Sequence, residues 1–81
     1  MSRPVELLDE ARRDVIEGRD FYESALAGLG GKFSAAVVKA LERVGWMPEL
    51  YGEVGAGVRA APVRRFGYVV YYRITPTAVE V

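Results

Sequence analysis

The chain has 81 residues, of which 51% are hydrophobic and 27% charged, and its 11 basic residues balance 11 acidic ones. So short a chain makes one domain, residues 1–81, and this composition is typical of a folded protein rather than a disordered tail. Cysteine and histidine are absent, which excludes disulfide bridges, thiol or imidazole catalysis and the usual zinc ligands. We therefore expect no metal and no other cofactor.

The sequence also carries no sign of a membrane segment. No apolar run approaches the roughly 20 residues that a membrane-spanning helix needs, and residues 1–10 lack the apolar core of a signal peptide. A protein without cysteine fits a reducing compartment. We expect a cytoplasmic protein without membrane contact.

The first third of the chain predicts a short strand and a helix. Val5–Leu8 is an apolar run behind Pro4, which is tolerated in an edge strand. Asp9 is placed to cap the helix that follows. The residues that recur at three- and four-residue spacing, and so form one apolar face, are Ala11, Val15, Gly18, Tyr22 and Ala25.

A second helix follows a glycine-rich turn at residues 28–31. It is expected to begin near Lys32 and to end at Gly45 and Pro48. Its apolar stripe consists of Phe33, Val37, Ala40, Leu41 and Val44. Two amphipathic helices with a short connection predict an antiparallel helical hairpin.

The last third predicts strands. Residues 48–57 contain three glycines and are expected to form a loop. Three segments rich in valine, tyrosine and isoleucine follow, at residues 58–63, 65–74 and 77–81, and their short connections predict an antiparallel meander. The expected fold is therefore α+β, in the order β-α-α-β-β-β, with the helical hairpin on one face of a small antiparallel sheet.

The strand at residues 65–74 has two distinct faces. Phe66, Tyr68, Val70, Tyr72 and Ile74 alternate on the face that we expect beneath the helices, where the tyrosines serve as core residues with their hydroxyls in water. The other face carries Gly67, Val69, Tyr71 and Arg73. An exposed apolar patch beside a charge is typical of a partner surface, and self-association is the alternative.

Five segments, in order, resemble the RelE/ParE toxin superfamily, also called plasmid stabilisation proteins. They are residues 10–14 with 21–23, 28–33, 44–48, 58–59 and 66–73. The last resembles the family's Phe-Pro-Tyr strand, with Gly67 in place of the proline. The resemblance covers nearly the whole chain, and the order of its segments makes it specific.

The resemblance implies the toxin of a type II toxin–antitoxin pair, neutralised by a cognate antitoxin. The Phe-x-Tyr and Tyr-Tyr-Arg pattern is closer to the ParE-like branch, which inhibits DNA gyrase by binding it and has no catalytic residues of its own. The antitoxin would lay an amphipathic helix or an added strand against the open face of the sheet and its edges. The expected partner-binding residues are Arg59, Arg65, Val69, Tyr71 and Arg73. Without antitoxin, we expect poor solubility or a homo-oligomer.

Two alternatives stay open. The RelE-like branch cleaves messenger RNA with cationic residues that stabilise the developing charge, but the resemblance places these on Ala60, Pro62 and Val69, which are uncharged. The neutral total charge also argues against direct nucleic-acid binding, although four arginines against one acid after Gly57 leave a local site open. Family members usually continue into a functional tail, whereas this chain stops at Val81, so a shortened, inactive antitoxin-binding module is the second alternative.

Overall fold

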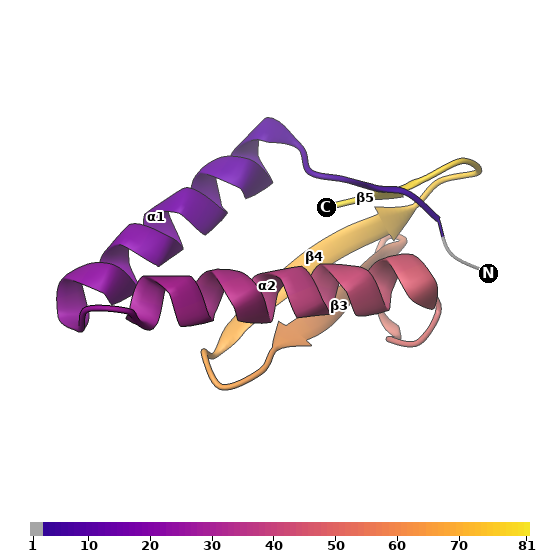
Figure 1. The fold of residues 1–81 in the computed structure, drawn as a ribbon. Helices are drawn as coiled ribbons and strands as arrows, with labels where there is room; N and C mark the ends of the chain where they lie inside the picture. The colour runs from indigo at the N-terminus through magenta and orange to yellow at the C-terminus, as the bar shows by residue number, and fades with distance from the viewer. Residues whose placement is uncertain (1–2) are drawn as a thin grey trace.

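The computed structural model describes residues 3–81, so Met1 and Ser2, the first two residues of the predicted domain, lie outside the described part. The elements are β1 (Val5–Glu6), α1 (Asp9–Ala25), α2 (Leu29–Trp46), β2 (Glu53–Gly55), β3 (Val58–Val63), β4 (Tyr68–Ile74) and β5 (Val79–Glu80). The helical hairpin packs on a five-stranded open sheet, with α2 lying across β3 and β4 (Figure 1). The predicted α+β fold is confirmed.

The sheet has the strand order β1-β5-β4-β3-β2. The predicted meander, β3 to β5, is antiparallel, as expected, and β2 extends it by one more antiparallel strand. β1 pairs with β5 in parallel, with Val5 opposite Val79. Backbone bonds from Val79 N to Pro4 O and from Val81 N to Glu6 O, both 2.9 Å long, hold this pair together. The sheet is therefore mixed. β1 and β2 lie at opposite edges of the sheet, and the two helices carry the chain from one edge to the other.

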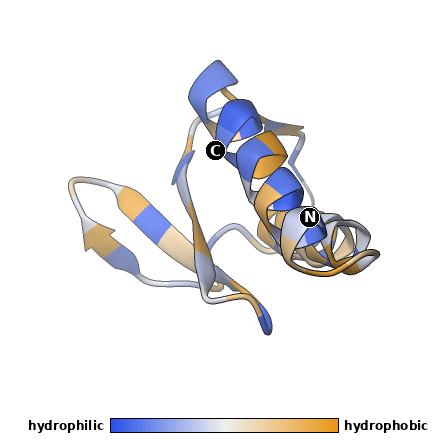
Figure 2. Ribbon diagram, turned by 90° about the vertical axis from the view of Figure 1, so that its left-hand side faces the viewer, coloured by the Kyte–Doolittle hydropathy of each residue, from blue (hydrophilic) through white to orange (hydrophobic). Residues whose placement is uncertain are grey.

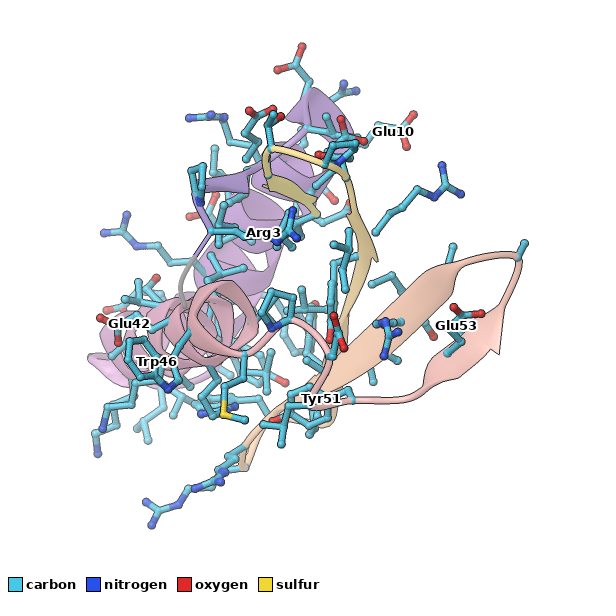
Figure 3. The ribbon with its side chains drawn as sticks, turned by 90° about the vertical axis from the view of Figure 1, so that its right-hand side faces the viewer. Arg3, Glu10, Glu42, Trp46, Tyr51 and Glu53 are labelled. Carbon is cyan, nitrogen blue, oxygen red and sulfur yellow. The ribbon has the colours of Figure 1, made fainter. Side chains whose placement is uncertain are left out.

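The segment predicted as a loop, residues 48–57, contains the strand β2. A two-residue turn, Ala56-Gly57, joins β2 to β3, with φ angles of 51° and 76°. Positive φ at both positions is what the tight turn of a β-hairpin requires, and Asn-Gly is its usual sequence. Because alanine stands at position 56 where asparagine is usual, the sequence pattern did not predict this hairpin. The hairpin extends away from the helices, with Tyr51 near its base (Figure 3).

The start of α2 also differs from the prediction. The helix begins at Leu29 instead of Lys32, directly after Gly28, whose φ of 89° lies in the left-handed region. The Glu23 carboxylate accepts hydrogen bonds from the backbone N–H groups of Gly28 and Gly30, each 3.0 Å long. These N–H groups have no partner within the helix, and Glu23 satisfies them from α1.

Other boundaries moved by a few residues. Leu8 occupies the position before α1, and no side chain caps this helix, so the prediction that Asp9 would cap it was wrong. β4 begins at Tyr68, since residues 64–67 form a turn, and β5 is limited to Val79–Glu80.

The core lies between α2 and the facing side of β3 and β4. Phe33, Val37, Ala40 and Val44 from α2 pack against Ala61, Val63, Val70 and Tyr72 from the strands. The alternation along β4 is confirmed for Val70 and Tyr72, which are buried while Val69, Tyr71 and Arg73 are exposed. Tyr68, also expected beneath the helices, is 38% exposed.

Tyr72 is buried to its hydroxyl. This group donates a 2.7 Å hydrogen bond to the carbonyl oxygen of Pro48, so the expectation of a hydroxyl in water was wrong for Tyr72. Burial raises the pKa of the Tyr72 hydroxyl above its usual value, and the charge of Arg59 opposes this shift without cancelling it. The tyrosine therefore ties β4 to the chain just after α2.

Candidate partner-binding site

The predicted patch on the open face of β4 is present in the structure. Val69 is 44% exposed, Tyr71 is 59% exposed, and Arg73 projects from the same face. Their partners on β3 are Pro62, Ala60 and Val58, all uncharged. The face turned away from α2 is thus apolar over two strands, with one arginine at its end.

The other two predicted partner-binding residues lie elsewhere. Arg59 pairs with Tyr72, and directly opposed residues share a face, so Arg59 lies on the helix side of the sheet. Its guanidinium donates to Tyr51 O at 2.6 Å and lies 4.0 Å from the Glu53 carboxylate, which fixes the base of the β2–β3 hairpin. Arg65 lies in the turn before β4, at the edge of a different groove. The structure therefore brings together only Val69, Tyr71 and Arg73.

One edge of β4 is open along most of its length. β5 pairs with Arg73 and Ile74 alone, so within residues 3–81 the stretch Tyr68–Tyr72 has a strand partner only on its β3 side. Unpaired N–H and C=O groups along such an edge are a template for another strand.

A groove of about 600 Å³ lies beside this open edge. Its far wall is the N-terminal half of α1, and its apolar lining comes from α1, from α2 and from the sheet. The apolar residues on the helix side are Leu8, directly before α1, Ala11 and Val15 from α1, and Phe33 and Val37 from α2. α1 diverges from α2 toward its N-terminal end (Figure 1), and the groove lies between this end of α1 and the open edge of β4.

Three carboxylates lie along the α1 side of this groove. They belong to Asp9, Glu10 and Asp14, and no basic residue is among the residues that line it. All three are exposed. The groove thus combines an apolar interior with a negatively charged rim, which favours an apolar segment flanked by basic residues.

This groove does not follow from the sequence pattern. The spacing of apolar residues places Ala11 and Val15 on the buried face of the first helix, whereas the structure leaves them only partly covered. One signal was available: the predicted last strand, residues 77–81, is half the length of the ten-residue strand predicted before it. A short strand cannot pair with all of its longer neighbour, so an open edge followed from those two lengths.

No helix in residues 3–81 is long and apolar enough to cross a bilayer. Within the same residues, no three carboxylates come together in a way that could hold a metal ion. No family model matches the chain, and no curated protein matches it significantly.

Proposed function

We propose that this protein is the toxin of a type II toxin–antitoxin pair and that its antitoxin binds the groove beside β4. The observation that carries the proposal is the coincidence of an unpaired strand edge, Tyr68–Tyr72, with an apolar groove of about 600 Å³. The order of helices and strands and the family resemblance of the sequence support the toxin assignment. Such a pair acts in the cytoplasm, where its target and its antitoxin are found.

The geometry suggests how the antitoxin binds. An extended segment adds a strand to β4, and its main chain bonds to the free N–H and C=O groups of Tyr68–Tyr72. Alternate side chains of that strand enter the groove and cover Ala11 and Val15, which are only partly buried. Basic residues at its end approach the carboxylates of Asp9, Glu10 and Asp14 and guide the encounter.

The open face of the sheet supports inhibition by binding rather than RNA cleavage. Ala60, Pro62 and Val69, where the nuclease branch carries its catalytic cations, lie close together on β3 and β4, since Pro62 pairs with Val69. Phosphodiester cleavage needs positive charge at the point where negative charge develops. An apolar surface with Tyr71 at its centre suits a protein target, and DNA gyrase is the target that the ParE-like resemblance implies.

Induced expression of the chain in a bacterial host without antitoxin tests the proposal. We expect growth arrest with an SOS response, and purified protein should inhibit supercoiling by gyrase. Co-expression of the product of the adjacent upstream reading frame should relieve the arrest. Arrest with cleaved transcripts and intact supercoiling would instead establish the RNA-cleaving alternative. Soluble protein without any effect on growth would contradict both toxin functions.

A matched pair of variants tests the groove itself. Ala11→Trp fills the groove from α1 without removing a packed side chain. We expect this variant to arrest growth as before but to resist relief by the antitoxin. Arg13→Trp places the same ring at an exposed position of α1 outside the groove and should still be relieved. Equal relief of both variants would place the antitoxin elsewhere on the surface.

A further inference from the structure

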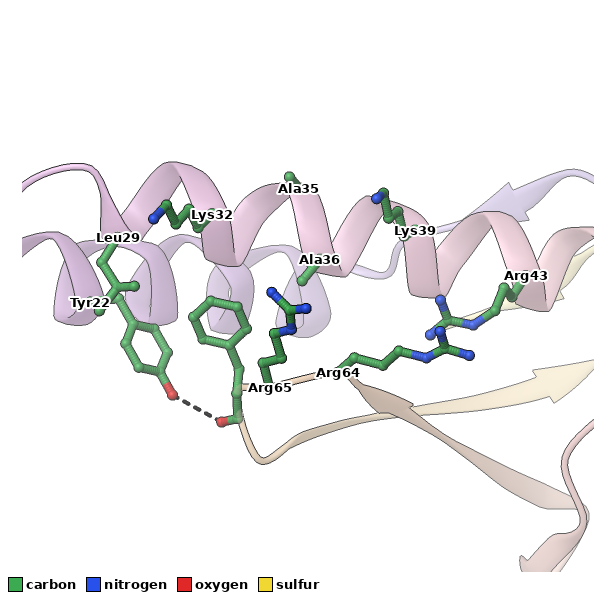
Figure 4. A pocket seen from close by; sticks show the side chains of 10 residues that line it. Tyr22, Leu29, Lys32, Ala35, Ala36, Lys39, Arg43, Arg64 and Arg65 are labelled. Carbon is green, nitrogen blue, oxygen red and sulfur yellow. Dashed lines mark hydrogen bonds between the residues drawn. The ribbon is translucent and has the colours of Figure 1, made fainter.

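A second groove, of about 620 Å³, lies on another side of the molecule, between α2 and the turn that joins β3 to β4. Its apolar lining consists of Tyr22, Leu29, Ala35, Ala36 and Phe66. Its polar lining is entirely cationic: Lys32, Lys39 and Arg43 follow one another along α2, and Arg64 and Arg65 come from the turn (Figure 4). No acidic residue lines it.

The five basic residues concentrate positive charge in one groove, although the chain as a whole has no net charge. The groove holds 5 of the 11 basic residues of a chain whose formal net charge is zero. Among residues 3–81 the one ion pair joins Arg59 to Glu53, so none of the groove cations has a carboxylate within 4.0 Å. Like charges gathered without counter-charges repel one another, and a bound anion removes that repulsion.

The spacing of the cations suits an extended anion. Lys32, Lys39 and Arg43 share one face of α2, and eleven residues of helix span about 16 Å. Arg64 and Arg65 approach from the opposite wall, so an anion between the walls meets positive charge on two sides (Figure 4). One phosphate would contact part of this array, whereas linked phosphates would contact all of it.

Hydrogen bonds hold Arg43 and the backbone of the turn in place before any ligand arrives. Arg43 donates to the Tyr51 hydroxyl at 3.2 Å and to the carbonyl oxygen of Pro62 at 3.1 Å. The Tyr22 hydroxyl of α1 donates a 3.0 Å bond to the carbonyl oxygen of Phe66, which anchors the turn.

Arg65 has a φ of 75°, a left-handed conformation that arginine rarely adopts. Strain of this kind persists where the surrounding structure imposes it, and it is typical of functional sites. Glycine would relieve the strain in this turn, yet arginine occupies the position, which fits a role for its charge.

We propose that this groove binds an oligophosphate, a ligand with two or more linked phosphate groups such as a nucleoside triphosphate or inorganic tripolyphosphate. Its volume falls in the range of small-molecule sites, and the guanidinium fork of arginine matches phosphate oxygens. Glu23, bonded to Gly28 and Gly30, lies beside the Leu29 end and repels a longer polyanion that continues past it. The proposal does not depend on the toxin assignment.

Titration of the purified protein with sodium tripolyphosphate and with ATP, in low salt and with EDTA, tests the site by calorimetry. We expect saturable binding of one ligand per chain that weakens as salt is added. Tighter binding of ATP than of tripolyphosphate would identify a nucleotide as the ligand, and equal binding would identify the phosphate chain alone. A single-stranded oligonucleotide or poly-glutamate that binds more tightly than both would overturn the proposal.

The variant Arg65→Gly tests whether the guanidinium of Arg65 binds phosphate, because it removes this group without straining the turn. Because glycine accepts positive φ without strain, the variant should melt at the same temperature as the parent or higher, yet bind tripolyphosphate about tenfold more weakly, the effect of losing one charged contact. Arg12→Gln removes an exposed cation of α1 outside the groove and should change binding less than twofold. Equal weakening by both variants, or no saturable binding by the parent protein, would refute the site.

Discussion

The two helices of the hairpin are almost equal in length, with 17 and 18 residues, but they are packed very differently. α2 lies across the sheet and buries Gly30, Phe33, Val37, Ala40, Val44 and Gly45. α1 buries only Gly18, where the ring of Phe33 and the Tyr68 hydroxyl leave no room for a Cβ atom. Along α1, hydrophilic residues outnumber apolar ones, as its coloured bands show (Figure 2).

This difference assigns most of the folding stability to α2 and the groove beside β4 to α1. The contacts of α2 with β3 and β4 form the one buried cluster of the described chain, so they carry most of the free energy of folding. α1 rests mainly on α2, and its apolar residues at the groove remain partly exposed. Segments with few buried contacts open at low free-energy cost, and binding sites are drawn from such segments.

The largest test of this comparison uses the same residue type on each helix. Phe33 is 0% exposed and contacts the rings of Tyr22, Phe66 and Tyr68, whereas Phe21 on α1 is 65% exposed. Phe33→Ala should lower the free energy of unfolding by about 3–5 kcal/mol, enough to unfold so small a domain. Phe21→Ala should lower it by less than about 1 kcal/mol.

Urea denaturation followed by circular dichroism measures both values. Similar losses for the two variants would mean that α1 contributes to the core as much as α2 does.

The packing of α2 on the sheet follows largely from the sequence pattern alone. The spacing of Phe33, Val37, Ala40 and Val44 predicts the buried stripe of α2, and the alternation along β4 predicts which face lies beneath it. These predictions succeeded because the burial of one regular element against another repeats with the period of the helix or strand.

The two grooves did not follow from sequence pattern, for two physical reasons. The groove beside β4 depends on how far α1 diverges from the sheet, and no local periodicity of the sequence determines that distance. The second joins α2 to a turn that lies more than twenty residues further along the chain, so Lys32 and Arg65 meet only in the folded state. Arg65 was predicted as part of a strand, and its left-handed backbone removed it from the partner-binding patch.

A smaller test concerns two adjacent glycines at the start of α2. A Cβ atom on Gly30 would lie 2.7 Å from the backbone oxygen of Arg19 in α1, whereas one on Gly31 meets no atom within 4 Å. Gly30→Ala forces the helices apart and should cost about 2 kcal/mol, as overpacking does. Gly31→Ala should stabilise the protein by about 0.5–1 kcal/mol, since alanine favours helix more than glycine does.

Measured against the parent protein, the melting temperature should fall for Gly30→Ala and rise for Gly31→Ala. A loss of stability in both would show that the flexibility of the connection, and not the close contact between the helices, explains the glycines.

The smallest test uses neighbouring tyrosines on opposite faces of β4. Tyr72→Phe removes the hydroxyl that bonds to Pro48 and should lower the free energy of unfolding by about 1 kcal/mol at neutral pH. Tyr71→Phe, on the exposed face, should change it by less than about 0.5 kcal/mol.

The pH dependence of stability tests the same hydroxyl. Because burial raises the pKa of Tyr72 in the folded state, its neutral form contributes stability that is complete below the usual tyrosine pKa, near 10. Above pH 10 the unfolded chain loses this proton first, so stability falls as the pH rises toward the raised pKa. Tyr72→Phe should therefore lose less stability than the parent between pH 9 and 11 in urea denaturation. Parallel curves for the two proteins would mean that the Tyr72 hydroxyl titrates as freely when folded as when unfolded.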